Sequence, residues 1–110
     1  MVIYTTITGG IDKLREPEVV TPNASYICFT DDSNVKSDIW QIRPMPVTKF
    51  NDDHVRRSKM IKILPHVFLP EYEISVWVDG NVSIKEDISH FVEMSLLKHD
   101  LAFYRHPEPF

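Results

Sequence analysis

Residues 74–84 read ISVWVDGNVSI, an apolar run that is interrupted once, by Asp79-Gly80-Asn81. The β-branched and aromatic residues before Asp79 are typical of a strand that is buried on both faces. Asp-Gly is a strong hairpin signal, so a turn is one interpretation of the interruption. The other is a metal and phosphate site at the end of a buried strand. The rest of the chain has to decide between them.

Two earlier segments also combine a strand pattern with a polar end. Residues 2–8 are β-branched and aromatic nearly throughout and stop at Gly9-Gly10, and residues 26–30 stop at Asp31-Asp32. Glycine and aspartate are turn formers, so both segments end where a strand would end. Shorter apolar runs predict two more strands, at 39–42 and 101–104.

The strongest helix signal begins at Asp52 or Asp53, because an aspartate caps the positive end of a helix well. One apolar face follows at the spacing i, i+3, i+4, i+7 and i+8, formed by Met60, Ile63, Leu64, Val67 and Phe68. Pro65 interrupts this face, so we expect a kink or a restart there. A second helix is expected over 87–97, capped by Asp87 or Ser89.

The expected order is strand, strand, short strand, helix, strand, helix, strand. Strands that alternate with helices predict an α/β fold with a mostly parallel sheet flanked by helices. Open sheets of this kind bind ligands at the carboxyl ends of their strands. The polar strand ends should therefore meet along one edge, and this convergence is harder to dismiss than any single motif.

Composition narrows the possible functions. The 110 residues, 43% hydrophobic and 25% charged, predict one globular domain over 1–110. The formal net charge of −4 argues against a general nucleic-acid binder, and no apolar run approaches the ~20 residues of a membrane-spanning helix. The single cysteine, Cys28, excludes an internal disulfide and favours a cytoplasmic location.

A nucleoside diphosphate sugar would suit the predicted edge. Asp79 and Asn81 are two residues apart, so on a regular strand their side chains point to the same side. Their oxygens are hard ligands for a divalent metal, which would neutralise the charge on the leaving diphosphate. Gly80 between them would let a phosphate approach the backbone closely.

Cations and ribose-binding groups are also within reach of this edge. Arg56, Lys59 and Lys62 follow one flank of the predicted helix, and Arg56, with Arg57 beside it, lies at the end that would face the phosphates. Asp31 or Asp32 is a candidate for hydrogen bonds to the ribose or base. Taken singly, the basic stripe is more often a solvated helix face, Asp31-Asp32 a turn, and Trp77 a core residue.

Five blocks carry a family resemblance in order along the chain. They are Tyr4-Thr5-x-Ile7-x-Gly9-Gly10, Tyr26-Ile27-Cys28-Phe29-Thr30-Asp31-Asp32, Lys62-Ile63-Leu64-Pro65-His66, Trp77-Val78-Asp79-Gly80-Asn81 and His106-Pro107. In these blocks the chain resembles the DUF616 glycosyltransferase-like proteins, which include bacterial capsule-type and plant cell-wall transferases.

The resemblance implies a Rossmann-like GT-A fold, a nucleotide-sugar donor and a glycan acceptor, with Mn²⁺ or Mg²⁺ as cofactor. It places Asp79 and Asn81 at the metal-binding Asp-x-Asp motif, and it places the loop from Thr5 to Gly10 in the nucleotide pocket. Arg56, Lys59 and Lys62 match the basic helix of the family.

The family pattern breaks off after His106-Pro107, and GT-A domains are commonly about twice this length. The chain is therefore expected to be the N-terminal donor-binding portion of a metal-dependent, hexosyltransferase-like enzyme, with no catalytic base assigned. The alternative is a non-catalytic α/β module for assembly or regulation, which would form homo-oligomers through an exposed sheet edge. A dinucleotide-binding protein is disfavoured, since no G-x-G-x-x-G follows the first strand.

Overall fold

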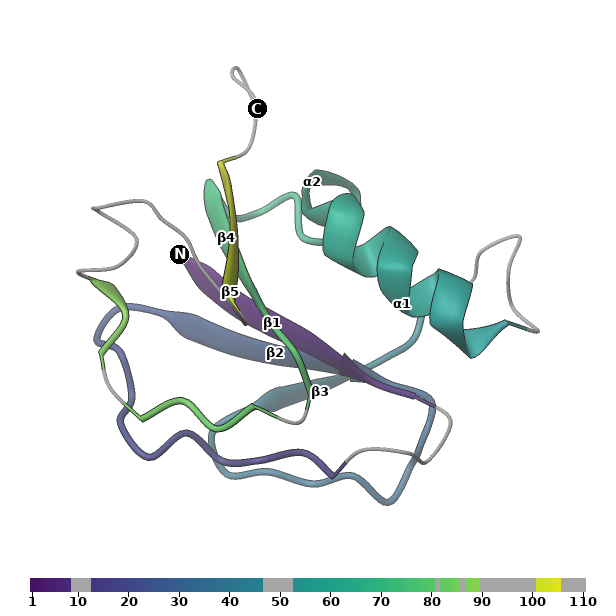
Figure 1. Cartoon of the computed structure of the whole chain (residues 1–110), viewed down its shortest axis with the longest axis horizontal. Helices are drawn as coiled ribbons and strands as arrows, with labels where there is room; N and C mark the ends of the chain where they lie inside the picture. The colour runs from purple at the N-terminus through teal and green to yellow at the C-terminus, as the bar shows by residue number, and fades with distance from the viewer. Residues whose placement is uncertain (9–12, 47–52, 81, 86, 90–100, 106–110) are drawn as a thin grey trace.

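A computed structural model describes residues 1–8, 13–46, 53–80, 82–85, 87–89 and 101–105 (Figure 1). Its centre is a five-stranded sheet in the order β3-β2-β1-β4-β5. The strands are β1 (Val2–Ile7), β2 (Ser25–Thr30), β3 (Gln41–Pro44), β4 (Ile74–Val78) and β5 (Leu101–Arg105). Strands β1 to β4 are parallel to one another, and β5 is antiparallel to β4. The predicted α/β fold with a mostly parallel, Rossmann-like sheet is confirmed.

Two helices connect β3 to β4, namely α1 (His54–Ile63) and α2 (Pro65–Phe68). Asp53 caps α1, because its carboxylate accepts a hydrogen bond from the Arg56 backbone N–H at 3.1 Å. Leu64 leaves the helical conformation, with φ −118° and ψ 51°, and the chain restarts at Pro65. The break predicted at the proline is therefore confirmed, and proline suits the first position of a helix.

The sheet has two differently covered faces. Side chains of β1 alternate, so Val2 and Tyr4 pack under the helices, whereas Ile3 and Ile7 face the other way. On that other face the cover is irregular chain before β2 and β3 and after β4, which supplies Trp40, Ile84 and further apolar side chains (Figure 1). Both faces of the central strands are thus dry, which explains their continuous apolar sequences.

The buried face of α1 differs from the predicted one. Ile63 and Val67 are 60% and 54% exposed, whereas Ile61 is fully buried against the sheet. Ile61 and Ile63 belong to the same helix, so α1 is rotated relative to the predicted apolar face, in the direction set by the contact of Tyr4 with the Lys62 carbonyl. The predicted apolar face through Ile63 and Val67 was wrong for this reason, whereas the predicted break at the proline was not.

The third strand begins two residues later than predicted. Residues 37–40 form a turn instead, because the Ser37 hydroxyl accepts hydrogen bonds from the backbone N–H groups of Ile39 and Trp40 at 3.0 and 2.8 Å. The strand then runs to Pro44, which is tolerated because β3 lies at the sheet edge. The predicted strand over 74–84 forms only as far as Val78.

Most of the helix predicted over 87–97 lies outside the described residues. At its start, the Ile88 N–H donates to the Thr21 hydroxyl at 3.0 Å, and the Ser89 N–H donates to the Asp87 carboxylate at 2.8 Å. None of the helices in the described part of the chain is long and apolar enough to cross a membrane.

Candidate functional site

The carboxyl ends of the parallel strands lie at one edge of the sheet, and α1 begins beside that edge (Figure 1). One contact fixes this arrangement, since the hydroxyl oxygens of Thr8, which follows β1, and Ser58, in α1, are 3.1 Å apart. The start of α1 is therefore anchored next to the end of β1. The edge brings together the turn after β2, the residues after β4 and the first turns of α1. Gly9, Gly10 and Asn81 belong to the predicted site and lie outside the described residues.

A cavity of about 410 Å³ opens at this edge between β2, β3 and α1. It is lined by Thr30, Asp31, Asp32, Ser33, Ile42, Arg43, Pro44, Met45 and Arg57. Two carboxylates and two guanidinium groups therefore share one depression with an apolar floor. That combination can accept hydrogen bonds from hydroxyl groups and donate hydrogen bonds to an anion.

Asp32 has a structural task in the wall of this cavity. Its backbone N–H donates to the Thr30 hydroxyl at 3.0 Å, and its carboxylate accepts from the Asn34 N–H at 2.8 Å. These contacts form the turn that ends β2, in agreement with the turn interpretation of this pair. Asp31, in contrast, is exposed at the cavity wall.

The predicted basic residues do not act as one stripe. Arg56 is exposed and forms a surface ion pair with Asp53, with Nε and Oδ2 3.5 Å apart, and Lys59 is exposed as well. The Lys62 ammonium lies 5.7 Å from the centre of the Trp77 ring, a cation–π arrangement beneath the helix. None of these three side chains lines the cavity.

Arg57 is the basic residue of α1 that lines the cavity, which it shares with Arg43 of β3. Its guanidinium donates to the Pro46 carbonyl at 3.4 Å, which holds the side chain over the strand edge. From the sequence, Arg57 was a candidate for phosphate binding only as the neighbour of Arg56. The signal was present, because Arg57 precedes the buried Ile61 by four residues and so shares its helix face.

Asp79 directly follows β4 and points to the α1 side of the sheet. One of its carboxylate oxygens accepts a hydrogen bond from the Trp77 indole N–H at 2.8 Å. The turn interpretation of Asp79-Gly80 is confirmed, because the Asp79 carbonyl accepts a hydrogen bond from the Val82 N–H at 3.0 Å. The turn does not make a tight hairpin, because β4 pairs with β1 and with the distant β5. Since β4 ends at Val78, Asp79 does not lie on the regular strand expected from the sequence.

The residues present suit a cation that brings its own phosphate ligands. Among the described residues, no three His, Cys, Asp or Glu side chains cluster closely enough to hold a metal ion. A Mg²⁺-type ion, however, commonly uses one or two carboxylates together with substrate phosphates and waters. Asp79 would supply such a carboxylate through its second oxygen, and Asn81 would be the neighbouring ligand.

Thr5 lies in the middle of β1 and is 1% exposed. It shares the face of Ile3 and Ile7, away from α1, and its hydroxyl oxygen has no hydrogen-bond partner among the described residues. The structure thus places Thr5 inside the sheet and Thr8, three residues later, at the edge.

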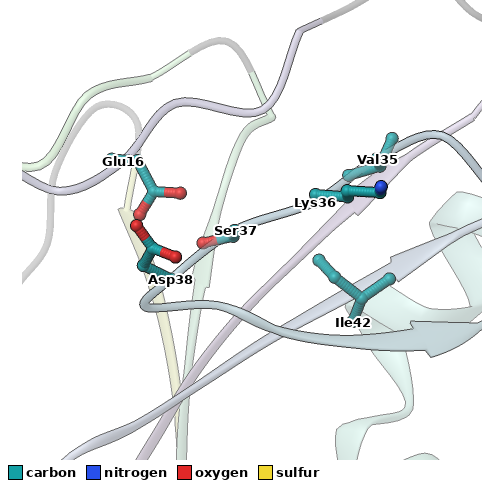
Figure 2. Close-up of a pocket in the computed structure, with 6 residues that line it drawn as sticks. All are labelled: Glu16, Val35, Lys36, Ser37, Asp38 and Ile42. Atoms are coloured by element: carbon teal, nitrogen blue, oxygen red, sulfur yellow. The ribbon is translucent and has the colours of Figure 1, made fainter.

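A second depression, of about 590 Å³, lies beside the chain that precedes β3, and Ile42 lines both depressions. Figure 2 shows the carboxylates of Glu16 and Asp38 pointing toward one another, with Ser37 beside them and Lys36 turned away. None of the residues that line the second depression belongs to the predicted site, so the carboxyl edge of the sheet is the candidate site that we consider further.

Comparison with known families gives one match, to the TOD1/MUCI70, glycosyltransferase-like domain, over residues 30–110. The chain belongs to this family. The match begins at the end of β2 and covers both helices and β4, so it includes the cavity turn, Arg57 and Asp79. No curated protein matches the chain.

Membership of the TOD1/MUCI70 glycosyltransferase-like family confirms the family resemblance, and the match contains the three later sequence blocks, from Lys62 to Pro107. It gives the chain a glycosyltransferase-like function in general terms, with a sugar donor and an acceptor as partners. The family match and the parallel sheet edge agree, because an open α/β sheet presents its ligand site where Asp31, Arg57 and Asp79 lie.

Proposed function

We propose that the chain binds a nucleoside diphosphate sugar at the carboxyl edge of its sheet, as the donor-binding part of a GT-A type, hexosyltransferase-like enzyme. The observation that carries the proposal is the cavity at the end of β2, because both Asp31 and Arg57 line it. A nucleotide needs both kinds of group, because its ribose and base offer donors and its phosphates are acceptors.

Each residue of the edge has a distinct task in this proposal. The exposed Asp31 accepts hydrogen bonds from ribose hydroxyls or from the base, while Arg57 donates to a phosphate with two parallel N–H groups. Asp79 and Asn81 hold a divalent cation, Mn²⁺ or Mg²⁺, against the pyrophosphate. Bound there, the cation supplies positive charge for the departing diphosphate.

In the transfer, the bond between the anomeric carbon and the diphosphate oxygen breaks, and an acceptor hydroxyl forms the new glycosidic bond after losing its proton. The described residues bind and orient the donor for this step. Arg57 stabilises charge on the leaving group, because its guanidinium keeps its charge at any working pH. The glycan acceptor and the group that takes the proton lie outside this assignment.

A thermal-shift titration with UDP, GDP and CDP, each with and without Mn²⁺, tests the proposal. One nucleotide should raise the unfolding temperature only with the metal, because a ligand of the folded state stabilises it by about 2.7 kcal/mol at a hundredfold excess over Kd. Asp79→Asn should abolish the metal effect. Asp38→Asn, which removes an exposed carboxylate from the other depression, is the matched control and should retain the effect. Stability that no nucleotide changes would reject the proposal.

One observation favours the alternative role as an assembly module. The short strand β3 is at the edge of the sheet, where its outer hydrogen-bonding groups can pair with a second chain. Light scattering distinguishes the two roles, since an assembly module would form a dimer or larger species whose mass and stability do not respond to nucleotide. A monomer that responds to nucleotide would reject this alternative.

A further inference from the structure

The Asp79 carboxylate is held by one specific contact. The Trp77 indole N–H donates to its Oδ1 at 2.8 Å, and Trp77 is itself 6% exposed. Trp77 packs in the core on the α1 side of the sheet, and its hydrogen bond brings the Asp79 carboxylate to the same side. One carboxylate oxygen of Asp79 therefore accepts the hydrogen bond of the indole.

The indole is fixed in turn by two other elements. The Tyr4 ring of β1 packs edge-on against Trp77, with centroids 5.4 Å apart and planes at 71°. The Lys62 ammonium of α1 lies 5.7 Å from the Trp77 ring centre. The Tyr4 hydroxyl donates to the Lys62 backbone carbonyl at 2.7 Å, so the two supports are also joined to each other. The direction of the indole N–H is thus set by β1 and α1 together.

We propose that Trp77 is a positioning residue for the cation site at Asp79, an inference that rests on the proposed function. Its N–H holds Oδ1 so that Asp79 offers a single oxygen, in one orientation, to the cation. Hydrogen bonds that orient a metal-binding carboxylate commonly account for about 10- to 100-fold in metal affinity. Trp77 touches neither the metal nor the sugar nucleotide and acts only through Asp79.

Trp40 provides a matched control. It is the other tryptophan of the chain, and its indole N–H donates to the Arg15 carbonyl at 3.0 Å. Its ring packs edge-on against Tyr26 at 5.2 Å, and it is 4% exposed. It lies on the sheet face opposite Trp77. Replacing either tryptophan by phenylalanine removes one indole hydrogen bond and comparable packing, but only Trp77→Phe frees Asp79.

The decisive measurement is the Kd of Mn²⁺, obtained by electron paramagnetic resonance in the presence of UDP, GDP or CDP. Trp77→Phe should weaken Mn²⁺ binding at least about 10-fold, whereas Trp40→Phe should stay within about twofold of the wild type. Equal Kd values in Trp77→Phe and wild type would overturn the inference and leave the proposed function standing. An equal loss in both variants would also overturn it, because general loosening of the core would then explain the effect.

A measurement on the wild-type protein covers the case in which Trp77→Phe fails to fold. With two tryptophans, the indole region of a ¹⁵N–¹H spectrum contains two signals. Mg²⁺ added with the nucleotide should shift the Trp77 signal and leave that of Trp40 in place. Cation binding without a Trp77 shift would refute the positioning role. Failure of the wild type to bind Mn²⁺ with any of the three nucleotides would instead refute both the metal site of the proposed function and the inference.

Discussion

Tyr4→Phe removes one hydroxyl and leaves an aromatic ring of nearly the same shape in the core. The hydroxyl donates to the Lys62 carbonyl at 2.7 Å and so ties β1 to the last turn of α1. Carbonyls in the last turn have no partner within their own helix, and Tyr4 supplies this one. The net value of such a bond is about 0.5–1.5 kcal/mol, rising to about 1–3 kcal/mol when the acceptor is left buried.

Because this bond is only partly buried, we expect Tyr4→Phe to lower the free energy of unfolding by about 1–2 kcal/mol. For a domain of this size each kcal/mol lost corresponds to a fall of about 4–8 °C in Tm. Chemical denaturation measures the first quantity and calorimetry the second. Hydrogen exchange shows where in the structure the stability is lost, since amides of α1 should exchange faster once the helix is no longer bonded to β1.

Tyr26→Phe is the matched control for this prediction. The Tyr26 hydroxyl accepts from the Thr21 backbone N–H at 2.9 Å on the opposite sheet face, so its loss should destabilise the protein without a selective effect on α1. The reasoning would be refuted by an unchanged unfolding free energy in Tyr4→Phe. It would equally be refuted if α1 exchanged no faster in Tyr4→Phe than in Tyr26→Phe.

Other perturbations give further expected outcomes. Arg57→Gln should weaken nucleotide binding about tenfold or more in a calorimetric titration, since a charged hydrogen bond is lost. Arg56→Gln should leave nucleotide binding nearly unchanged, because Arg56 lies outside the cavity. Equal losses in the two variants would contradict the phosphate-binding role of Arg57. Burial raises the pKa of the Cys28 thiol from 9.0 to about 12, so a disulfide reagent at pH 8 should label it only as fast as the protein opens. Because the folded state retains this proton longer, the unfolding free energy should fall as pH rises above 9.0, more steeply than in Cys28→Ala. Hydrogen bonds from the Ser89 side chain and backbone lower the pKa of the Asp87 carboxyl below 3.8. The ionised carboxylate therefore stabilises the folded state above pH 3.8, and this stabilisation is lost as the pH falls through the lowered pKa. Ser89→Ala should raise the pKa of Asp87 in an NMR titration.

The strands and the helix break could be predicted because their signals are local. Continuous apolar sequence indicates a strand covered on both faces, as β1 and β2 are. Pro65 lacks a backbone N–H and so ends α1 wherever the helix packs. The parallel arrangement of β1 to β4, which puts their carboxyl ends along one edge, was also predicted from the alternation of strand and helix patterns.

The rotation of α1 could not be predicted in this way. A helix of ten residues has too few apolar positions to define its buried face, and here tertiary contacts decide it. The bonds from Tyr4 to the Lys62 carbonyl and from Thr8 to Ser58 turn Ile61 and Arg57 toward the sheet. The choice of Arg57 over Arg56 at the cavity therefore depends on contacts between residues far apart in the sequence.

Only part of the orientation of Asp79 could be predicted from the sequence. Strand alternation predicts residues 77 and 79 on one side, as the structure has them, although β4 ends one residue before Asp79. Whether the indole then reaches the carboxylate depends on the rotamer of Trp77, and that rotamer is set by its neighbours Tyr4 and Lys62.

The strand order also has a consequence for how the chain folds. The central strand β1 is the first to be synthesised, and it pairs with β2 through contacts such as Val2 with Ser25. Its second neighbour is β4, where Val2 meets Ser75, so that side of β1 stays open until most of the chain is available. Closing so long a loop is slow, and an unpaired apolar strand is prone to intermolecular pairing in the interval. We therefore expect refolding yield to fall with protein concentration, and a nascent chain ending before residue 74 to depend on chaperones.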